Sequence, residues 1–373
     1  MISYRGFSRY YIIFIFFSFT YSSSYILSGG TANVGLFPEL YYLKHATIVF
    51  LMPVTILFFC SKKISLINPV FIMLFPMSSY LFISYGVFFL QFLFFIFGIY
   101  AISLAYKNDF LLNKKTIFLL LLLFLSIPVW DIVLNNSNFI YNSFYGRDRL
   151  LLGFFHPKEA GISLLVISLM FLLSYRFKNY LFYSVFIVSL VTLLFSIQSR
   201  NALLFLVNFL LIDFSIKKIG LTATLFVLSF IYILLPTILV SIFYDQLNLL
   251  SSNRLDVWLS GLDMNFFGRL GSVSTSSASD SLWKYKFHID NFYLEFLIEA
   301  GIFYFILLLF SLIYIGLKLR KKVLNNYRVI ALFIAFLIFC LFDAGMFSTG
   351  NILNIFIWSV IAFVLSKRYL DNA

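Results

Sequence analysis

Long apolar runs separated by short polar segments make up most of the chain and set its predicted elements. A helix needs about 20 apolar residues to cross a bilayer, and by that measure we predict about twelve membrane-spanning helices. Their approximate bounds are Tyr10–Leu27, His45–Cys60, Ile67–Ile83, Val87–Tyr106, Thr116–Leu134, Gly161–Tyr175, Tyr180–Ile197, Asn201–Phe214, Leu221–Phe243, Phe292–Leu317, Val329–Met346 and Ile352–Leu365. We therefore expect an all-α polytopic membrane protein in which residues 1–373 form a single integral membrane domain.

Composition agrees with this class. Hydrophobic residues fill 62% of the 373 positions and charged residues 11%, whereas a soluble domain keeps roughly a quarter of its residues charged. No polar stretch is long enough to build a separate soluble domain. The first run follows MISYRGFSR without a small-residue cleavage site, so we expect a retained signal anchor rather than a removable signal peptide.

Lysine and arginine positions predict the orientation. With the N-terminus in the cytoplasm, 18 of the 27 basic residues lie on the cytoplasmic side, as the positive-inside rule requires. Both termini are then cytoplasmic. The net charge of +12 is explained by this topology and gives no reason to expect nucleic-acid binding.

The remaining basic residues lie on the predicted outer side. Positive charge there opposes the insertion bias, so its clustering calls for a functional explanation. Most of it falls in or beside two larger outer loops, residues 135–160 and 244–291. The nine residues are Lys44, Arg147, Arg149, Lys158, Arg200, Arg254, Arg269, Lys284 and Lys286.

Three predicted spans run from outside to inside, and their first turns are polar: HPKEAG, QSRNALL and HIDNFYLEFLIEAG. A helix N-terminus presents unpaired N–H groups and partial positive charge to an anion. Arg149, Arg200 and Arg254 would add full charges beside these three helix starts, and a guanidinium pairs bidentately with phosphate oxygens. The sequence therefore predicts an outer-face site for a phosphate-bearing, lipid-linked ligand.

Each residue also has a structural interpretation. Pro is favoured at the first position of a helix, so His156 is either a helix cap or a catalytic group. Ser199 and Asp290 are good N-caps. Arg147 and Arg149 can pair with neighbouring acids and simply hold a loop.

Glu295 and Glu299 lie four residues apart on one face of a predicted helix. A carboxylate just inside a membrane usually faces a water-filled cavity or a partner, so these two can either fix an arginine or take part in catalysis. No metal or cofactor is expected, because the three histidines are scattered and no Asp-x-Asp pair is present to hold a divalent cation. The two cysteines, Cys60 and Cys340, show no metal-ligand spacing.

Four segments, in order, resemble a known group. RLLLGFFHPKEAGISLL, QSRNALLFL, NRLDVWLSGL and DNFYLEFLIEAG resemble the O-antigen and capsule polysaccharide polymerases (Wzy), and are similar to the O-antigen ligases of the same superfamily. The resemblance covers roughly residues 147–301 and the number of spans. The first five spans resemble nothing specific.

The resemblance implies a GT-C-like, inverting, metal-independent glycosyltransferase at the outer face of the bacterial inner membrane. Its substrates would be undecaprenyl-diphosphate-linked oligosaccharides, which it would polymerise into O-antigen or capsular polysaccharide. A chain-length regulator and a flippase are partners that this function allows.

The resemblance and the outer charges together select the candidate residues. Asp290, His156 and Arg200 are the catalytic candidates. Arg147, Arg149, Arg254 and Asn291 are the candidates for binding the diphosphate, and Arg269, His288, Glu295 and Glu299 are secondary candidates. We expect the arginines to neutralise the leaving diphosphate and Asp290 or His156 to orient or deprotonate the acceptor hydroxyl.

Two other functions compete with this one. The ligase pattern places a His where this chain has Asp290, although Leu294 and Gly301 fit its spacing, and this departure favours a polymerase. A lipid-linked oligosaccharide flippase should spread its charges over both halves of a central cavity, whereas here they concentrate on outer loops of the second half. A purely structural subunit would not explain the outer arginines.

Overall fold

The computed structural model is helical, and contacts divide it into two units. Unit 1 comprises residues 1–64, 93–207 and 347–373, and unit 2 comprises residues 65–92 and 208–346. The residues that the structure describes are 4–29, 35–43, 114–135, 138, 140–144, 147–174, 179–250, 255–256, 291–322, 327–343, 346 and 351–366.

Four helices are long and apolar enough to cross a membrane. They are Lys115–Asn135, Tyr180–Ile197, Leu221–Asn248 and Gly301–Lys321. The chain is therefore a multi-pass membrane protein, as its hydrophobic pattern predicted. The number of about twelve spans stays a prediction, because His45–Cys60, Ile67–Ile83 and Val87–Tyr106 lie outside the described residues.

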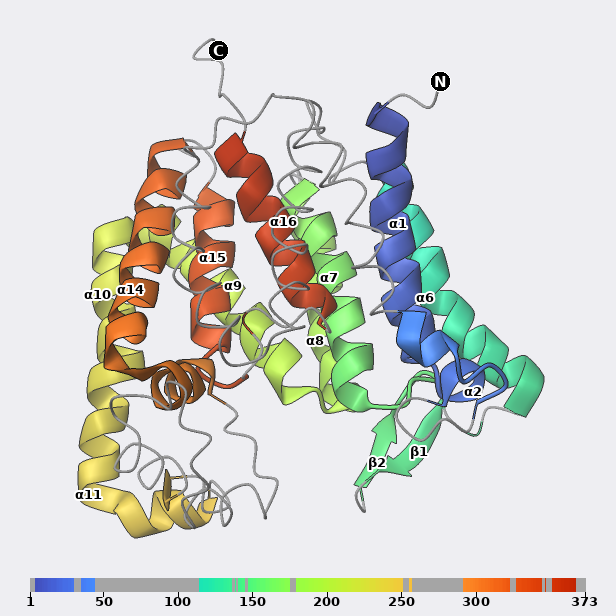
Figure 1. Ribbon diagram of the computed structural model, residues 1–373, viewed down its shortest axis with the longest axis horizontal. Helices are drawn as coiled ribbons and strands as arrows, with labels where there is room; N and C mark the ends of the chain where they lie inside the picture. Colours follow the sequence, from blue (N-terminus) through green and yellow to red (C-terminus); the bar gives the residue numbers. More distant parts are fainter. Residues whose placement is uncertain are drawn as a thin grey trace. The chain divides into compact units, whose positions relative to one another are not determined.

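Unit 1 is built around one buried helix. Its elements are α1 (Tyr4–Ser22), α2 (Tyr25–Ser28), α6 (Lys114–Asn135), α7 (Pro157–Ser174), α8 (Tyr180–Ile197), the first residues of α9 (Arg200–Ile219) and α16 (Ile352–Ser366). α7 packs against α6, α8 and α16, and α1 packs against α6 and α16 (Figure 1). Residues 160–170 of α7 are all buried. A helix that is apolar on every side lies either inside a protein core or against lipid, and α7 lies in the core.

A β-hairpin interrupts the helical pattern in the first outer loop. Strands β1 (Tyr141–Phe144) and β2 (Arg147–Leu150) pair antiparallel. The sequence predicted an outer loop over residues 135–160 without naming strands in it, because two four-residue strands are too short for an alternating pattern to stand out beside such apolar helices.

Unit 2 contains α10 (Leu221–Ser229), the π-helical turn η3 (Phe230–Leu234), α11 (Leu235–Leu250), α14 (Phe292–Lys322) and α15 (Tyr327–Phe339), which follow the end of α9. α15 is mostly buried and packs against α14. α10, η3 and α11 follow one another, with a kink at Phe243 inside α11, and most of their apolar side chains are exposed, as expected of a lipid-facing span. At the π-helical turn the hydroxyl of Tyr232 donates to the Asn208 side-chain carbonyl on α9.

The tenth predicted span differs from the structure at its start. Gly301 has φ 81° and ψ 169°, which breaks α14 into a short first segment and a long second one. Figure 1 shows the short segment turned across the end of the long one. The span therefore begins at Gly301 rather than Phe292, and the short segment that carries Glu295 and Glu299 precedes it. An L-residue rarely adopts this conformation, which is why a glycine stands at the break.

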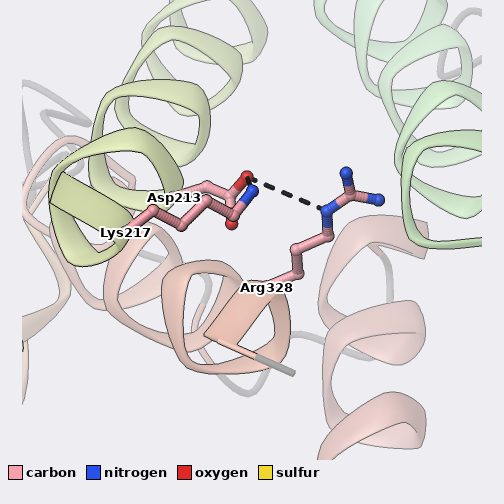
Figure 2. Close-up of polar contacts among 3 residues, drawn as sticks. All are labelled: Asp213, Lys217 and Arg328. Atoms are coloured by element: carbon pink, nitrogen blue, oxygen red, sulfur yellow. Dashed lines mark hydrogen bonds and ion pairs between the residues drawn. The ribbon is translucent and has the colours of Figure 1, made fainter. Parts of the chain in front are cut away.

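An ion cluster joins two helix ends in unit 2. Figure 2 shows Lys217 from α9 and Arg328 from α15 beside the carboxylate of Asp213. Lys217 Nζ lies 2.5 Å and Arg328 Nε 3.8 Å from Asp213 Oδ2. The positive-inside count places the end of α9 and the start of α15 on the same, cytoplasmic side. Their contact requires the two ends to lie on one side, and which side that is stays a prediction.

Candidate functional site

His156 caps the start of α7. Its Nδ1 accepts a hydrogen bond from the backbone N–H of Lys158 at 3.0 Å, and its carbonyl accepts from the N–H of Glu159 at 3.1 Å. Pro157 fills the first helical position, where a missing N–H does no harm. His156 is thus the N-cap of α7, which was one of its two predicted roles.

Arg149 comes to the same place from the hairpin. The register pairs Arg149 with Asn142, and its side chain is half-buried. Burial lowers the pKa of His156 below its ordinary value, and the positive charges of Lys158 and Arg149 lower it further. Two of the predicted site residues, Arg149 and His156, therefore lie close enough for one to act on the charge of the other. For Arg147 only the backbone is described.

The loop between β2 and α7 is held by the end of the first helix. Tyr25 N–H donates to the Gly153 carbonyl at 3.0 Å, and Phe155 N–H donates to the Ser23 carbonyl at 2.8 Å. The rings of Tyr25 and Phe155 stack with centroids 6.0 Å apart. These contacts hold Gly153 and Phe155, shortly before His156, to the N-terminal part of the chain. We call Ser23–Tyr25 the loop clamp.

The loop clamp is the part of the site that sequence reasoning missed. The first five spans resembled no family, so no role was assigned to them. The available signal was the polar run YSSSYILS, where a serine-rich segment directly follows an apolar helix. The buried side chains of Ser24 and Ser28 bond within this segment: Ser24 Oγ accepts from Leu27 N–H at 3.3 Å, and Ser28 Oγ donates to the Ser24 carbonyl at 2.8 Å.

The start of α9 lies against the start of α7. A Cβ added at Gly161 would stand 2.3 Å from both Cβ and Oγ of Ser199, so only glycine fits there. Ser199 is buried and precedes α9, while Arg200 is exposed. The segments HPKEAG and QSRNALL, which the sequence treated as separate motifs, are therefore in contact within unit 1.

Asn291 has a capping role in unit 2. It is buried, and its Oδ1 accepts from the Leu294 N–H at 3.2 Å at the start of α14. The next N–H, of Phe292, donates to the Cys340 carbonyl at 2.9 Å, which ties this helix start to the end of α15. Binding of a ligand by Asn291 would have to use its Nδ2, because its oxygen already caps the helix.

Asp256 anchors the described part of the second outer loop. Tyr244 Oη donates to its Oδ1 at 2.5 Å and Asn248 Nδ2 donates to its Oδ2 at 2.6 Å. These two hydrogen bonds, first that of Tyr244 and then that of Asn248, lower the pKa of Asp256. Asp256 belongs to the segment NRLDVWLSGL, and these hydrogen bonds tie this one residue of the segment to the end of α11.

The other candidates are placed in part or not at all. Arg254, Arg269, His288 and Asp290 lie outside the described residues. Glu295 and Glu299 lie on the short first segment of α14, where their side chains are not described. Among the residues that the structure describes, no three His, Cys, Asp or Glu side chains gather as metal ligands. The expected absence of a metal stays a prediction.

No protein-family model, curated protein or solved structure matches the chain.

The described geometry favours one kind of ligand. A capping imidazole lies near the half-buried guanidinium of Arg149 and the lysine of the first turn, and the start of α9 touches the same helix at Gly161. Cations and helix N–H groups in one place favour an anionic oxygen ligand.

Proposed function

We propose that the chain is a glycosyltransferase that polymerises lipid-diphosphate-linked oligosaccharide repeat units into O-antigen or capsular polysaccharide. The reaction would take place at the outer face of the bacterial inner membrane. The observation that carries this proposal is the contact between Gly161 and Ser199, which joins two of the four segments that resemble the polymerases. Segments that form one site must meet in space, and these two do.

In the proposed reaction the protein contributes positive charge rather than a covalent bond to the substrate. A hydroxyl oxygen of the acceptor repeat attacks the anomeric carbon of the donor chain, and the bond from that carbon to the diphosphate oxygen breaks. The lipid diphosphate leaves with the electron pair, and the hydroxyl proton passes to a base. Preorganised positive groups at the leaving oxygens stabilise such a transition state. Arg149 and Arg200 are proposed for this role in unit 1.

The remaining groups are proposed from the resemblance of the later segments of the chain to the polymerases. Arg254 is assigned to diphosphate binding together with Asn291, and Asp290 to proton abstraction from the acceptor hydroxyl. Support for these assignments comes from the order of the motifs in the chain. Asp256, from the same motif, is hydrogen-bonded to Tyr244 and Asn248 on α11.

Deletion of the gene tests the function. Loss of a polymerase leaves single repeat units attached to the final lipid acceptor. Loss of a ligase leaves none attached and polymer still on its carrier, and loss of a flippase traps repeat units on the cytoplasmic side. Either of the last two results would refute the polymerase assignment.

Complementation with single variants tests the site. Arg200→Ala should abolish polymer at unchanged protein level, because it removes a cation from the site, and Arg200→Lys should restore only part, because an ammonium cannot pair bidentately. Lys218→Ala is the matched control, since Lys218 is a basic residue at the other end of α9. Wild-type polymer with Arg200→Ala would contradict the assigned role.

A further inference from the structure

The long second segment of α14 has a buried face and an exposed face. The buried face contains Leu308, Leu312, Ile315 and Leu319, and α15 packs against this helix. On the other side, exposed apolar side chains recur every three or four residues, a spacing that keeps them on one face of a helix. They are Phe303, Ile306, Phe310, Ile313 and Leu317. In a helix apolar and long enough to cross a membrane, such a face lies against acyl chains.

Two cations continue the exposed face at the end of this helix. Arg320 and Lys321 follow Leu317 by three and four residues, and both side chains are exposed. Within the part of the chain that the structure describes, neither of them forms an ion pair or a hydrogen bond. Their charges are therefore presented beside the lipid-facing side chains. Just before them, the ammonium of Lys318 lies 5.2 Å from the ring centroid of Tyr314, and aromatic and basic side chains of this kind mark the membrane interface.

The cations of the neighbouring helix ends in unit 2 have a partner inside the protein. Lys217 of α9 and Arg328 of α15 both face the carboxylate of Asp213 (Figure 2). The positive-inside rule asks for basic residues on the predicted cytoplasmic side, and Lys217 meets that demand as well as Lys321 does. The rule does not require that two cations without an acidic partner continue the lipid-facing side of one helix.

We propose that Arg320 and Lys321 bind the phosphate of an anionic phospholipid whose acyl chains lie along the exposed face of α14. A guanidinium pairs bidentately with phosphate oxygens, and an ammonium adds a second charge. Basic groups beside a membrane surface attract anionic headgroups. The apolar face that leads up to the two cations selects a lipid, because a free phosphate would make no use of it. This inference goes beyond the proposed function and does not depend on it.

Photo-crosslinking of the full chain in nanodiscs tests the site. The nanodiscs contain phosphatidylcholine and a phosphatidylglycerol with a photoactivatable group near its phosphate, and mass spectrometry of the digested protein locates the label. We expect the end of α14 to be labelled at a lower lipid fraction than the other exposed helices. Arg320→Gln combined with Lys321→Gln should raise the fraction needed for half-maximal labelling roughly 25-fold, about fivefold for each cation. Even labelling of all exposed helices, or equal labelling of α14 by a photoactivatable phosphatidylcholine, would overturn the proposal.

Two control variants separate a lipid site from a general effect of charge or folding. Lys217→Gln removes a cation that Asp213 already holds, so it should leave the half-maximal lipid fraction unchanged. A shift as large as that of the double variant would mean that net positive charge, and not a site on α14, attracts the lipid. Arg320→Lys combined with Lys321→Arg keeps both charges and should be labelled like the native chain. If this exchange abolishes labelling, the loss in the glutamine variant comes from the fold and the proposal fails.

The source of the phosphate is tested in the same nanodiscs. Sodium phosphate should reduce the labelling of α14 no more than sodium chloride of equal ionic strength does, because screening acts alike in both. A clearly stronger reduction by phosphate would assign Arg320 and Lys321 to a free anion and refute the lipid site.

Discussion

Two polar clusters in this chain contain similar residues but differ in what their cations face. In unit 2, Asp213 lies between Lys217 and Arg328, so a carboxylate faces cations of opposite charge (Figure 2). In unit 1, the cations Arg149 and Lys158 act on an imidazole, which they help to keep neutral. The first arrangement satisfies its charges within the protein. The second places two positive charges near a ring that burial also keeps neutral.

The difference separates a structural cluster from a candidate site. A buried carboxylate with paired cations ties two helix ends together and gains little from a ligand. Cations gathered beside helix N-termini favour an anionic ligand. We therefore expect changes in the Asp213 cluster to affect stability alone, and changes around His156 to affect polymer formation as well.

The largest effect is expected at the contact between α7 and α9. Gly161→Ala puts a methyl group 2.3 Å from Ser199, and overpacking of this kind destabilises by about 1–3 kcal/mol. We expect a value near the upper end, about 3 kcal/mol, and loss of polymer, since both helix starts must shift. Thermal unfolding of the detergent-solubilised protein and polymer yield in cells measure the two effects.

Two further variants make this prediction specific. Ser199→Gly removes the clashing atoms and should restore most of the stability and activity of Gly161→Ala. Gly316→Ala is the matched control, because its Cβ would meet only Phe333, at an ordinary 3.6 Å. Failure of the double variant to recover would show that the two residues are not coupled.

The next effect concerns the Asp213 cluster. Asp213→Asn removes the negative charge but keeps the shape, leaving Lys217 and Arg328 without their counter-charge. Breaking a buried pair is worth about 3–5 kcal/mol, and we expect about 2 kcal/mol here because solvent screens both cations, which are 47% and 25% exposed. Polymer yield per folded protein should not change.

Two control variants in unit 2 set limits on this change in unfolding free energy. Lys217→Met should lower the unfolding free energy by less than about 0.5 kcal/mol, as for an exposed i,i+4 pair. Asp245→Asn, at an exposed acid on α11, should have no measurable effect. A drop in specific activity with Asp213→Asn, at normal stability, would remove the distinction between the two clusters.

The elements that the sequence predicted well are those with one strong signal. Tyr180–Ile197 was predicted with the bounds that the structure gives, because both ends are marked: Asn179 caps the start, and Gln198 ends the helix in a left-handed conformation. Phe292–Leu317 was predicted as one span, because an apolar run does not reveal the backbone turn that Gly301 makes. Hydrophobicity locates a helix but not a change of its direction.

The candidate site shows the same limit. Arg149 and His156 stood out because charge is rare in this chain, and their proximity in the sequence made a shared site plausible. The contact of Gly161 with Ser199 and the loop clamp at Ser23–Tyr25 depend on how distant segments pack. Nothing local to either segment encodes those contacts, so the sequence alone could not supply them.

A smaller effect is expected at the loop clamp. Tyr25→Ala removes the ring that stacks on Phe155 next to His156, and aromatic pairs are worth about 0.5–1.5 kcal/mol. We expect a loss of about 1 kcal/mol in unfolding free energy and a several-fold drop in polymer yield. Tyr25→Phe keeps the ring and should recover most of both. If Tyr25→Ala changed stability but not yield per folded protein, the clamp would be structural only.

The smallest effect is a pH dependence of the protein's stability that comes from His156. Because the folded state lowers the pKa of His156, the unfolded chain takes up the proton first as the pH falls. The stability contributed by the neutral ring is therefore present above the ordinary pKa of 6.5 and is lost as the pH falls from there through the lower folded value. His156→Asn keeps a cap but cannot titrate, so the melting temperature of the native chain should fall more between about pH 7 and pH 5 than that of the variant. Both proteins retain His45 and His288, so those two residues cannot produce the difference. Parallel curves for the two proteins would mean that His156 titrates alike in both states, and the neutralising effect of Arg149 and Lys158 would have to be abandoned.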